Sequence, residues 1–279
     1  ALAPCSRWPA PLRISVVPLY FGTSSARLFG VYHPAESAHH RSCGVVICPP
    51  FGHEYIRAHR LLRQLAVQLS RDGFHVLRFD YRGCGDSAGE PHDGSPSQWT
   101  ADIATAIDEL RYTSEVRRVC LVGLRLGATL AAAAADRRDD VEVVVLWDPV
   151  LEGARYLEEL RLLQRRWLSD RPGSRLFAFR RHVSEVIGFP ITEVMRAELA
   201  QTALAETLRL AVRRIIVLDS EDHESQRQWV VAAAGAWPDV MRDARCEAGD
   251  WHRPEFVHSA LLANKTMLRV AGLVAENVA

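Results

Sequence analysis

The stretch "VCLVGLRLGATLAAAAAD", residues 119–136, limits the possible folds of this chain more than any other. A short apolar run reaches Gly123, and a segment rich in alanine begins only a few residues later. This pattern predicts a buried strand that turns sharply into a helix packed closely on a sheet, with Arg125 at the turn. The free N–H groups at the start of the helix would point to the same place, which favours an anion there.

Strand-like and helix-like segments alternate on both sides of this turn. The expected strands are residues 14–21, 26–34, 43–50, 74–80, 118–123, 141–149, 213–219 and 240–248. The expected helices are residues 56–73, 99–113, 125–136, 224–235 and 254–276. Such alternation indicates an α/β fold with a mostly parallel central sheet and helices on both faces.

The alternation stops after Pro149 and resumes only at residue 213. Residues 151–207 have a helical pattern rich in arginine and leucine, with no expected strand. We therefore expect one core, formed by residues 1–150 and 208–279, with residues 151–207 inserted as a helical lid. The amphipathic, basic helices of this lid would cover an acyl chain or dock a partner such as a carrier protein.

Composition narrows the functional classes. The chain of 279 residues has 34 basic and 34 acidic residues, so its charge favours neither nucleic acid nor a membrane surface. Its apolar runs are too short to cross a bilayer. The six cysteines are scattered without a CxxC pair, and no export signal is recognisable, so we expect a reducing, cytoplasmic location. We expect neither a metal nor a cofactor, since no metal-binding cluster or GxGxxG turn is visible.

Three further motifs carry a family resemblance. The segments "PPFGHEYIRAHR", "RFDYRGCGDSAGEP" and "GLRLGA" together resemble the α/β-hydrolase superfamily, especially its serine aminopeptidase-like branch. More narrowly, they resemble hydrolase-like proteins associated with bacterial exosortase systems and biosynthetic clusters, in which arginine also replaces the serine nucleophile. The resemblance implies an α/β-hydrolase fold in which Arg125 stands at the nucleophile elbow. It also implies that the segment from Asp80 to Ser87 is a structural turn.

The superfamily order of nucleophile, acid and histidine assigns the remaining members of a triad. His252, expected between the last strand and the terminal helix, has the position of the general base. Asp219, Asp222 and His223 follow an expected strand, and Asp222 fits the position of the acid best. Asp148, after the preceding strand, is the alternative acid. Trp251 would be either a wall of the pocket or part of the core.

The segment after residue 50 would supply the other half of the site. In this superfamily the backbone N–H groups of the oxyanion hole come from this segment and from the residue after the elbow, here Leu126. Phe51 and Gly52 are the expected donors in the first segment. The residues that follow would line the pocket or merely cap the next helix; they are His53, Glu54 and Tyr55.

Arginine cannot attack a carbonyl group, which leaves two hypotheses. In the first, the protein is an enzyme without a serine nucleophile, and its small-molecule substrate carries an acyl group (an ester or thioester) or a carboxylate. His252 activates water or removes a proton from carbon, and Arg125 binds the anion, which gives hydrolysis, elimination or acyl transfer. Cys48 and Cys84 are alternative nucleophiles within it. In the second hypothesis, the protein has lost catalysis and uses Arg125 to hold an anionic ligand or to brace the lid.

Overall fold

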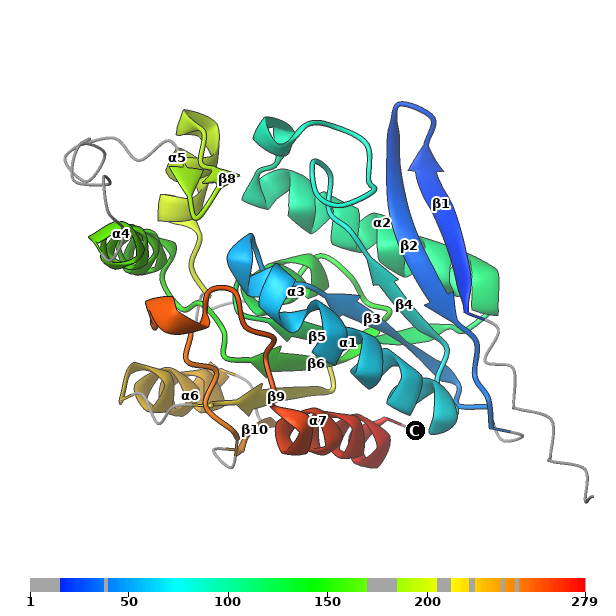
Figure 1. The fold of residues 1–279 in the computed structure, drawn as a ribbon. Coiled ribbons are helices and arrows are strands. Elements are labelled where there is room, and N and C mark those ends of the chain that lie inside the picture. Colours follow the sequence, from blue (N-terminus) through cyan, green and yellow to red (C-terminus); the bar gives the residue numbers. More distant parts are fainter. Residues whose placement is uncertain are drawn as a thin grey trace, which may run out of the picture.

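The computed structural model describes residues 16–37, 40–169, 185–204, 212–220, 224–236, 239–243 and 246–278. A mixed sheet of eight strands forms its centre, in the order β1-β2-β4-β3-β5-β6-β9-β10 (Figure 1). The strands are β1 (Val17–Thr23), β2 (Ala26–His33), β3 (Cys43–Cys48), β4 (Val76–Phe79), β5 (Arg118–Leu124), β6 (Val141–Trp147), β9 (Arg214–Leu218) and β10 (Val240–Asp243). The pairs β1–β2 and β2–β4 are antiparallel, and the other neighbours run parallel.

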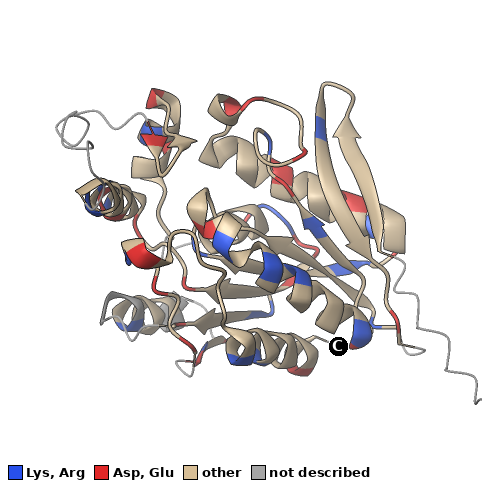
Figure 2. Ribbon diagram, viewed as in Figure 1, with Lys and Arg blue, Asp and Glu red and all other residues tan. Residues whose placement is uncertain are grey.

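Helices cover both faces of this sheet (Figure 1). They are α1 (His53–Arg71), α2 (Pro96–Ser114), α3 (Leu126–Ala135), α4 (Gly153–Ser169), α5 (Glu193–Gln201), α6 (Glu224–Ala236) and α7 (Asn264–Asn277). Helices α1 and α7 contact each other on one face, and α2 and α3 contact each other on the opposite face. Figure 2 shows acidic and basic residues interspersed over these elements. The expected mostly parallel sheet with helices on both faces is therefore confirmed.

Alternate residues of the central strands face opposite helix layers. In β5, Leu121 belongs to the hydrophobic cluster that includes α2 and α3, whereas Val122 belongs to the cluster that includes α1 and α7. Both side chains are buried. A strand buried on two faces needs apolar residues at every position, which explains the continuous apolar runs in the sequence.

The segment between β6 and β9 leaves the sheet and carries α4 and α5 (Figure 1). It also contains a short hairpin of β7 (Glu185–Val186) and β8 (Phe189–Pro190), so the expectation that it has no strand was wrong. The turn of this hairpin places both Ile187 and Gly188 at positive φ, 49° and 83°, a conformation typical of tight hairpins. Residues 170–184 and 205–207 of the expected lid lie outside the described residues.

Most element boundaries differ from the sequence-based expectation by at most three residues, and two near the end of the chain differ by more. The last helix begins at Asn264, not at residue 254, after a 3-10 turn over Pro254–Phe256. The apolar spacing before Asn264 suits a helix, but the Leu261 N–H donates to the Arg57 carbonyl of α1 instead of to a helical partner. Strand β10 ends at Asp243, whereas the expected strand extended to residue 248.

Candidate functional site

The turn between β5 and α3 has the geometry that the sequence predicted. Arg125 follows the last strand residue, Leu124, with φ 54° and ψ −125°, and its N–H donates to the Trp147 carbonyl at 2.9 Å. This turn requires a glycine two residues before Arg125 and another two residues after it. A Cβ atom on Gly123 would lie 2.4 Å from the Cα of Ala128, and one on Gly127 would lie 2.2 Å from the Pro49 carbonyl oxygen. Strand and helix approach so closely that neither position accepts a side chain.

The Arg125 side chain is buried and meets acceptors of the protein itself. Its Nε donates to Glu54 Oε1 at 3.0 Å, and its Nη2 lies 3.6 Å from Glu159 Oε2. Its Nη1 lies 3.5 Å from the Asp148 carbonyl oxygen. Burial disfavours the charged guanidinium, but Glu54 and the other acidic groups outweigh that effect and raise the pKa of Arg125. The guanidinium is thus a permanent cation held by internal carboxylates.

Glu54 joins this arginine to a third element. The residue is in the first turn of α1 and is almost completely buried. Its Oε2 accepts a hydrogen bond of 2.9 Å from the hydroxyl of Tyr156 in α4. The Arg125 guanidinium also stacks over the Tyr156 ring, 5.5 Å from the centroid. Because a buried charge is tolerated only when it is paired and hydrogen-bonded, these contacts fasten the elbow to α1 and α4 together.

Asp148 is the second buried carboxylate of the site and lies just beyond β6. Its Oδ1 accepts from the Ser220 N–H at 2.6 Å, and its Oδ2 accepts from the Ser220 hydroxyl at 2.5 Å. Oδ2 also accepts from Trp251 Nε1 at 2.9 Å. Burial raises the pKa of Asp148, and the hydrogen bonds from Ser220 and Trp251 oppose that rise. The described partners of this acid are therefore Ser220 and Trp251, rather than His252.

Two guanidinium groups lie over the Trp251 ring. The Arg125 group is 5.5 Å from the ring centroid and the Arg57 group 5.2 Å. Arg57 also donates to the carbonyl oxygens of Gly249 and Asp250, at 2.9 and 3.1 Å. Cation–π contacts and backbone hydrogen bonds together fix the indole beside Asp148.

His252 lies at the rim of this cluster, with 38% of its side chain exposed. Its Nδ1 is 4.0 Å from Glu159 Oε2, the same oxygen that faces Arg125 Nη2. The sequence analysis did not identify Glu159, because its only signal is a position one helical turn after Arg155, with which it pairs.

Asp222, the preferred acid, and His223 lie outside the described residues. Asp219 is buried and pairs with Arg242 at 2.6 Å.

The expected oxyanion donors stand at the starts of two helices. Gly52 precedes α1 with φ 62° and ψ −129°, nearly the conformation of Arg125 before α3, and neither helix has a side-chain cap. Phe51 packs against Trp99 and Phe189. Leu126 is buried. The N-terminal N–H groups of α1 and α3 are therefore not satisfied by their own cap side chains, as an oxyanion site requires.

His53 and Tyr55 do not join the Arg125 ion pairs. The His53 side chain is buried, its Nε2 has no hydrogen-bond partner among the described residues, and burial lowers its pKa. The Tyr55 hydroxyl donates to Asp80 Oδ1 at 2.6 Å. Asp80 also accepts from the Asp86 N–H, and its carbonyl accepts from the Ser87 hydroxyl. These contacts agree with a structural turn from Asp80 to Ser87.

The two cysteines considered as alternative nucleophiles, Cys48 and Cys84, have the properties of packing residues. Burial raises the pKa of the Cys48 thiol, and it raises that of Cys84 to about 12. Both thiols would remain protonated near neutral pH, which disfavours either as a nucleophile.

Over the described ranges, no group of three or more His, Cys, Asp or Glu residues is placed to hold a metal ion. Nor does any described helix combine the length and apolar character needed to cross a membrane.

Residues 44–183 match the model of the family described as serine aminopeptidase, S33. This chain belongs to that family. It is also 38% identical over 96 residues to protein ABHD12B of Homo sapiens, across 33% of this chain and 25% of that protein. An uncharacterized 31.7 kDa protein of Escherichia coli is 32% identical over 114 residues, which are 39% of this chain and 35% of that protein. The chain thus matches about a third or less of the length of these curated relatives.

Solved structures show the same fold. An esterase of Pyrococcus furiosus has a TM-score of 0.66 at 14% identity, and the match covers 99% of this chain and 95% of that chain. The mouse alpha/beta hydrolase domain-containing protein 10 has a TM-score of 0.57 at 16% identity, covering 93% of this chain and 99% of that chain. The α/β-hydrolase fold is therefore shown.

The contacts among Arg125, Trp251 and Asp148 can be compared with the catalytic triad of serine hydrolases. In a serine triad the acid accepts the ring N–H of the general base, and the other ring nitrogen faces the nucleophile. Here Asp148 accepts the indole N–H of Trp251, and Arg125 stacks on that same indole. An indole has no basic nitrogen and an arginine no nucleophilic atom at neutral pH. The contacts that run from Asp148 through Trp251 to Arg125 therefore include neither a basic ring nitrogen nor a nucleophile.

Proposed function

We propose that this family member has exchanged serine catalysis for a structural ion-pair centre and acts as a non-catalytic ligand-binding protein. One observation carries the proposal: Asp148 accepts the Trp251 indole N–H beside an elbow arginine that is already paired with Glu54. Residues 151–207 form a lid in this proposal, and Arg125 braces it through Tyr156 and Glu159 of α4. The arginine at the elbow then marks a subgroup of the family, as the exosortase-associated resemblance implies.

The proposed ligand is a small molecule with a carbonyl or acyl group. The uncapped N-termini of α1 and α3 would hold its oxygen. Charge makes the Arg125 guanidinium a poor anion site, because Glu54 and Glu159 already face it. A carrier protein as donor of the ligand stays a prediction. Three arginines of α4 pair within the helix with Glu158 or Glu159. Because their charges are already balanced, they give limited support to the docking of a carrier protein.

A second candidate function is hydrolysis without a covalent intermediate. It rests on the partly exposed His252, whose Nδ1 faces Glu159 at 4.0 Å. A carboxylate on one ring nitrogen leaves the other free to take a proton from water, or from carbon in an elimination or acyl transfer. Arg125 would then bind the developing anion only after Glu159 moves from its Nη2.

The two candidate functions differ in which residue would act as general base if serine were placed at position 125. The first requires a histidine at position 251, and the second already has His252. We suggest measuring hydrolysis of p-nitrophenyl acetate by four proteins: native, Glu54→Gln, Glu54→Gln/Arg125→Ser, and the last with Trp251→His added. The Glu54→Gln change removes the carboxylate that Arg125→Ser would leave buried and unpaired. We expect turnover only in the triple variant, about tenfold or more above the buffer rate, because Asp148 then orients a histidine beside the serine.

The other outcomes separate the alternatives. Turnover by Glu54→Gln/Arg125→Ser alone would identify His252 as a working base and contradict the assignment of Trp251 to the position of the base. Turnover by the native protein that His252→Ala abolishes would establish the second candidate. A triple variant that is folded by circular dichroism and inactive would show that Arg125, Trp251 and Asp148 do not have triad geometry.

A further inference from the structure

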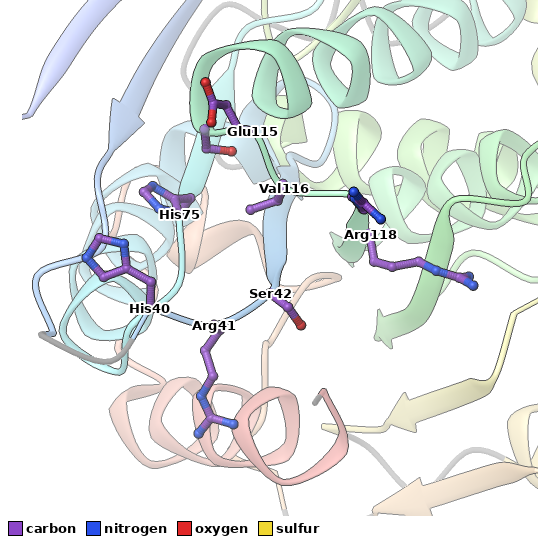
Figure 3. A pocket seen from close by; sticks show the side chains of 9 residues that line it. His40, Arg41, Ser42, His75, Glu115, Val116 and Arg118 are labelled. Carbon is purple, nitrogen blue, oxygen red and sulfur yellow. The ribbon is translucent and has the colours of Figure 1, made fainter.

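A hollow of about 500 Å³ lies at one edge of the sheet (Figure 3). Arg118, at the start of β5, lines this hollow, whereas Arg125 follows the other end of the same strand. The hollow is formed where three parallel strands begin: Ser42 precedes β3, His75 precedes β4, and Arg118 is the first residue of β5. Strand β5 has 7 residues between this edge and the elbow. At about 3.3 Å per residue the two places are about 20 Å apart. The hollow is thus separate from the candidate site, and its role does not depend on the proposed function.

The ionisable side chains around this hollow are mostly basic. Three arginines and two histidines line it, against a single carboxylate among its described residues, Glu115; the basic residues are Arg41, Arg117, Arg118, His40 and His75. Figure 3 shows the two histidines side by side on one wall, with Glu115 above them. A concave surface with one predominant sign of charge raises the local concentration of ligands of the opposite sign.

Two of these arginines donate hydrogen bonds to backbone carbonyl groups and form no ion pair with the residues that the structure describes. Arg41 donates through Nη1 to the carbonyl oxygens of Ala275 and Val278, at 3.4 and 3.3 Å, and its guanidinium lies over Phe74. Arg118 donates through Nη1 to the Asp139 carbonyl at 3.1 Å. Carbonyl groups carry no net charge, so these described partners leave the positive charge of both guanidinium groups unbalanced. This differs from Arg125, whose charge is balanced by carboxylates.

His75 contributes a donor of defined tautomer. Its Nδ1 accepts from the Ala35 N–H at 3.4 Å and therefore also from the Tyr32 hydroxyl at 2.6 Å. The proton of the neutral ring is consequently on Nε2. Burial, and then the neighbouring His40, lower the pKa of His75, so the ring is neutral at pH 7. The parallel Tyr32 ring, 5.9 Å away, fixes the orientation of this N–H donor.

We propose that this hollow binds a small phosphate monoester that carries hydroxyl groups, such as a sugar phosphate. Guanidinium groups and an imidazole N–H are suited to phosphate oxygens. The Glu115 carboxylate would accept hydrogen bonds from hydroxyl groups and disfavour a second phosphate. The volume of about 500 Å³ lies within the range of sites for small molecules.

The test uses glucose 6-phosphate as the probe and histidine ring signals as the readout. The full chain, labelled with ¹³C at histidine, is titrated at physiological salt, and the signals of His40 and His75 are assigned with His→Gln variants. We expect saturable shifts of both signals and weaker binding, by about fivefold or more, in Arg117→Gln. Arg60→Gln is the matched control, because it removes the same charge from the exposed face of α1 and should leave the affinity unchanged.

Comparison titrations with glucose and with inorganic phosphate test each part of the proposed ligand. Glucose should not bind, and inorganic phosphate should bind more weakly than glucose 6-phosphate. Equal affinity of the two phosphates would overturn the recognition of hydroxyl groups. Absence of saturation, or an equal loss of affinity in Arg117→Gln and Arg60→Gln, would overturn the site itself.

Discussion

The two ends of β5 carry the same residue type in opposite surroundings. Arg118 begins the strand, is exposed, and donates to a backbone carbonyl at the rim of an open hollow. Arg125 follows the end of the strand, is buried, and is paired with Glu54 and Glu159. Sequence neighbours do not explain this difference. It arises because α1 and α4 bring carboxylates to the carboxyl end of β5, whereas the described residues bring one carboxylate to the hollow at its amino end.

The comparison shows what an arginine at the turn between β5 and α3 requires. Arg125 has a positive φ, a strained conformation for a residue with a side chain. Gly52 has almost the same backbone angles at the equivalent turn before α1, but a Cβ there would meet the Phe189 ring at 3.3 Å. At Arg125 the side chain has room and buried partners, and those contacts offset the strain.

The largest effect should follow loss of the buried arginine. Arg125→Met leaves the buried Glu54 carboxylate without its cation, and we expect the free energy of unfolding to fall by about 3–5 kcal/mol. Urea denaturation followed by circular dichroism measures this loss. Adding Glu54→Gln should recover about 1–3 kcal/mol of it, since no unpaired charge then remains. Additive effects of the two changes would show that the pair is not coupled.

The buried His33 should make the free energy of unfolding depend on pH. Burial first, and then the charges of Arg78 and Arg63, lower the pKa of His33 from 6.5 to about 4. The stabilising contribution of neutral His33 is therefore present above pH 6.5 and is lost as the pH falls toward 4. Between pH 7 and 4 the native protein should lose about 2–3 kcal/mol more than His33→Gln. The exposed His40→Gln variant is the control, and it should follow the native protein.

A smaller effect is expected at the indole beside Asp148. Trp251→Phe keeps an aromatic ring beside Arg57 and Arg125 but removes the hydrogen bond to a carboxylate, and we expect a loss of about 2 kcal/mol. Trp229→Phe is matched to it, because Trp229 Nε1 donates to the neutral Leu204 carbonyl at 2.8 Å. That change should cost about 1 kcal/mol. Thermal denaturation of the two variants compares them directly, and a reversed order would contradict the charged state of Asp148.

The smallest effect is expected at the other end of β5. Arg118→Gln removes an exposed side chain and one hydrogen bond to the Asp139 carbonyl. The free energy of unfolding should change by less than about 0.5 kcal/mol in urea denaturation. A loss comparable to that of Arg125→Met would remove the contrast between the two arginines.

Much of the fold follows from local sequence patterns. The strand before Arg125, the glycines on either side of it and the alanine-rich helix after it specify the turn, because only that backbone geometry lets Gly127 approach Pro49. The terminal helix was placed about ten residues too early for the opposite reason. Its apolar spacing suited a helix, but a hydrogen bond from Leu261 to α1 holds the chain in another conformation.

The partners of the site depended on distances that the sequence does not contain. Sequence analysis named Arg125, Glu54, Asp148 and His252 as candidates from their positions beside strand ends and helix starts. It did not identify Glu159 or the role of Trp251, whose partners lie 34 and 103 positions away from them along the chain. Hydrogen bonds across such separations form only when the sheet and the segment between β6 and β9 are assembled.

The sequence by itself determined the mostly parallel α/β sheet and the position of Arg125 at a sharp turn, because apolar periodicity and glycine positions act locally. The α/β-hydrolase fold was implied by the family resemblance of three motifs. Only the tertiary structure decided what that arginine does. Burial removes water from the Arg125 guanidinium, and the carboxylates of α1 and α4 replace it. Whether a side chain binds a ligand or stabilises the fold depends on which acceptors the folded chain places within hydrogen-bonding distance, and that is set by packing.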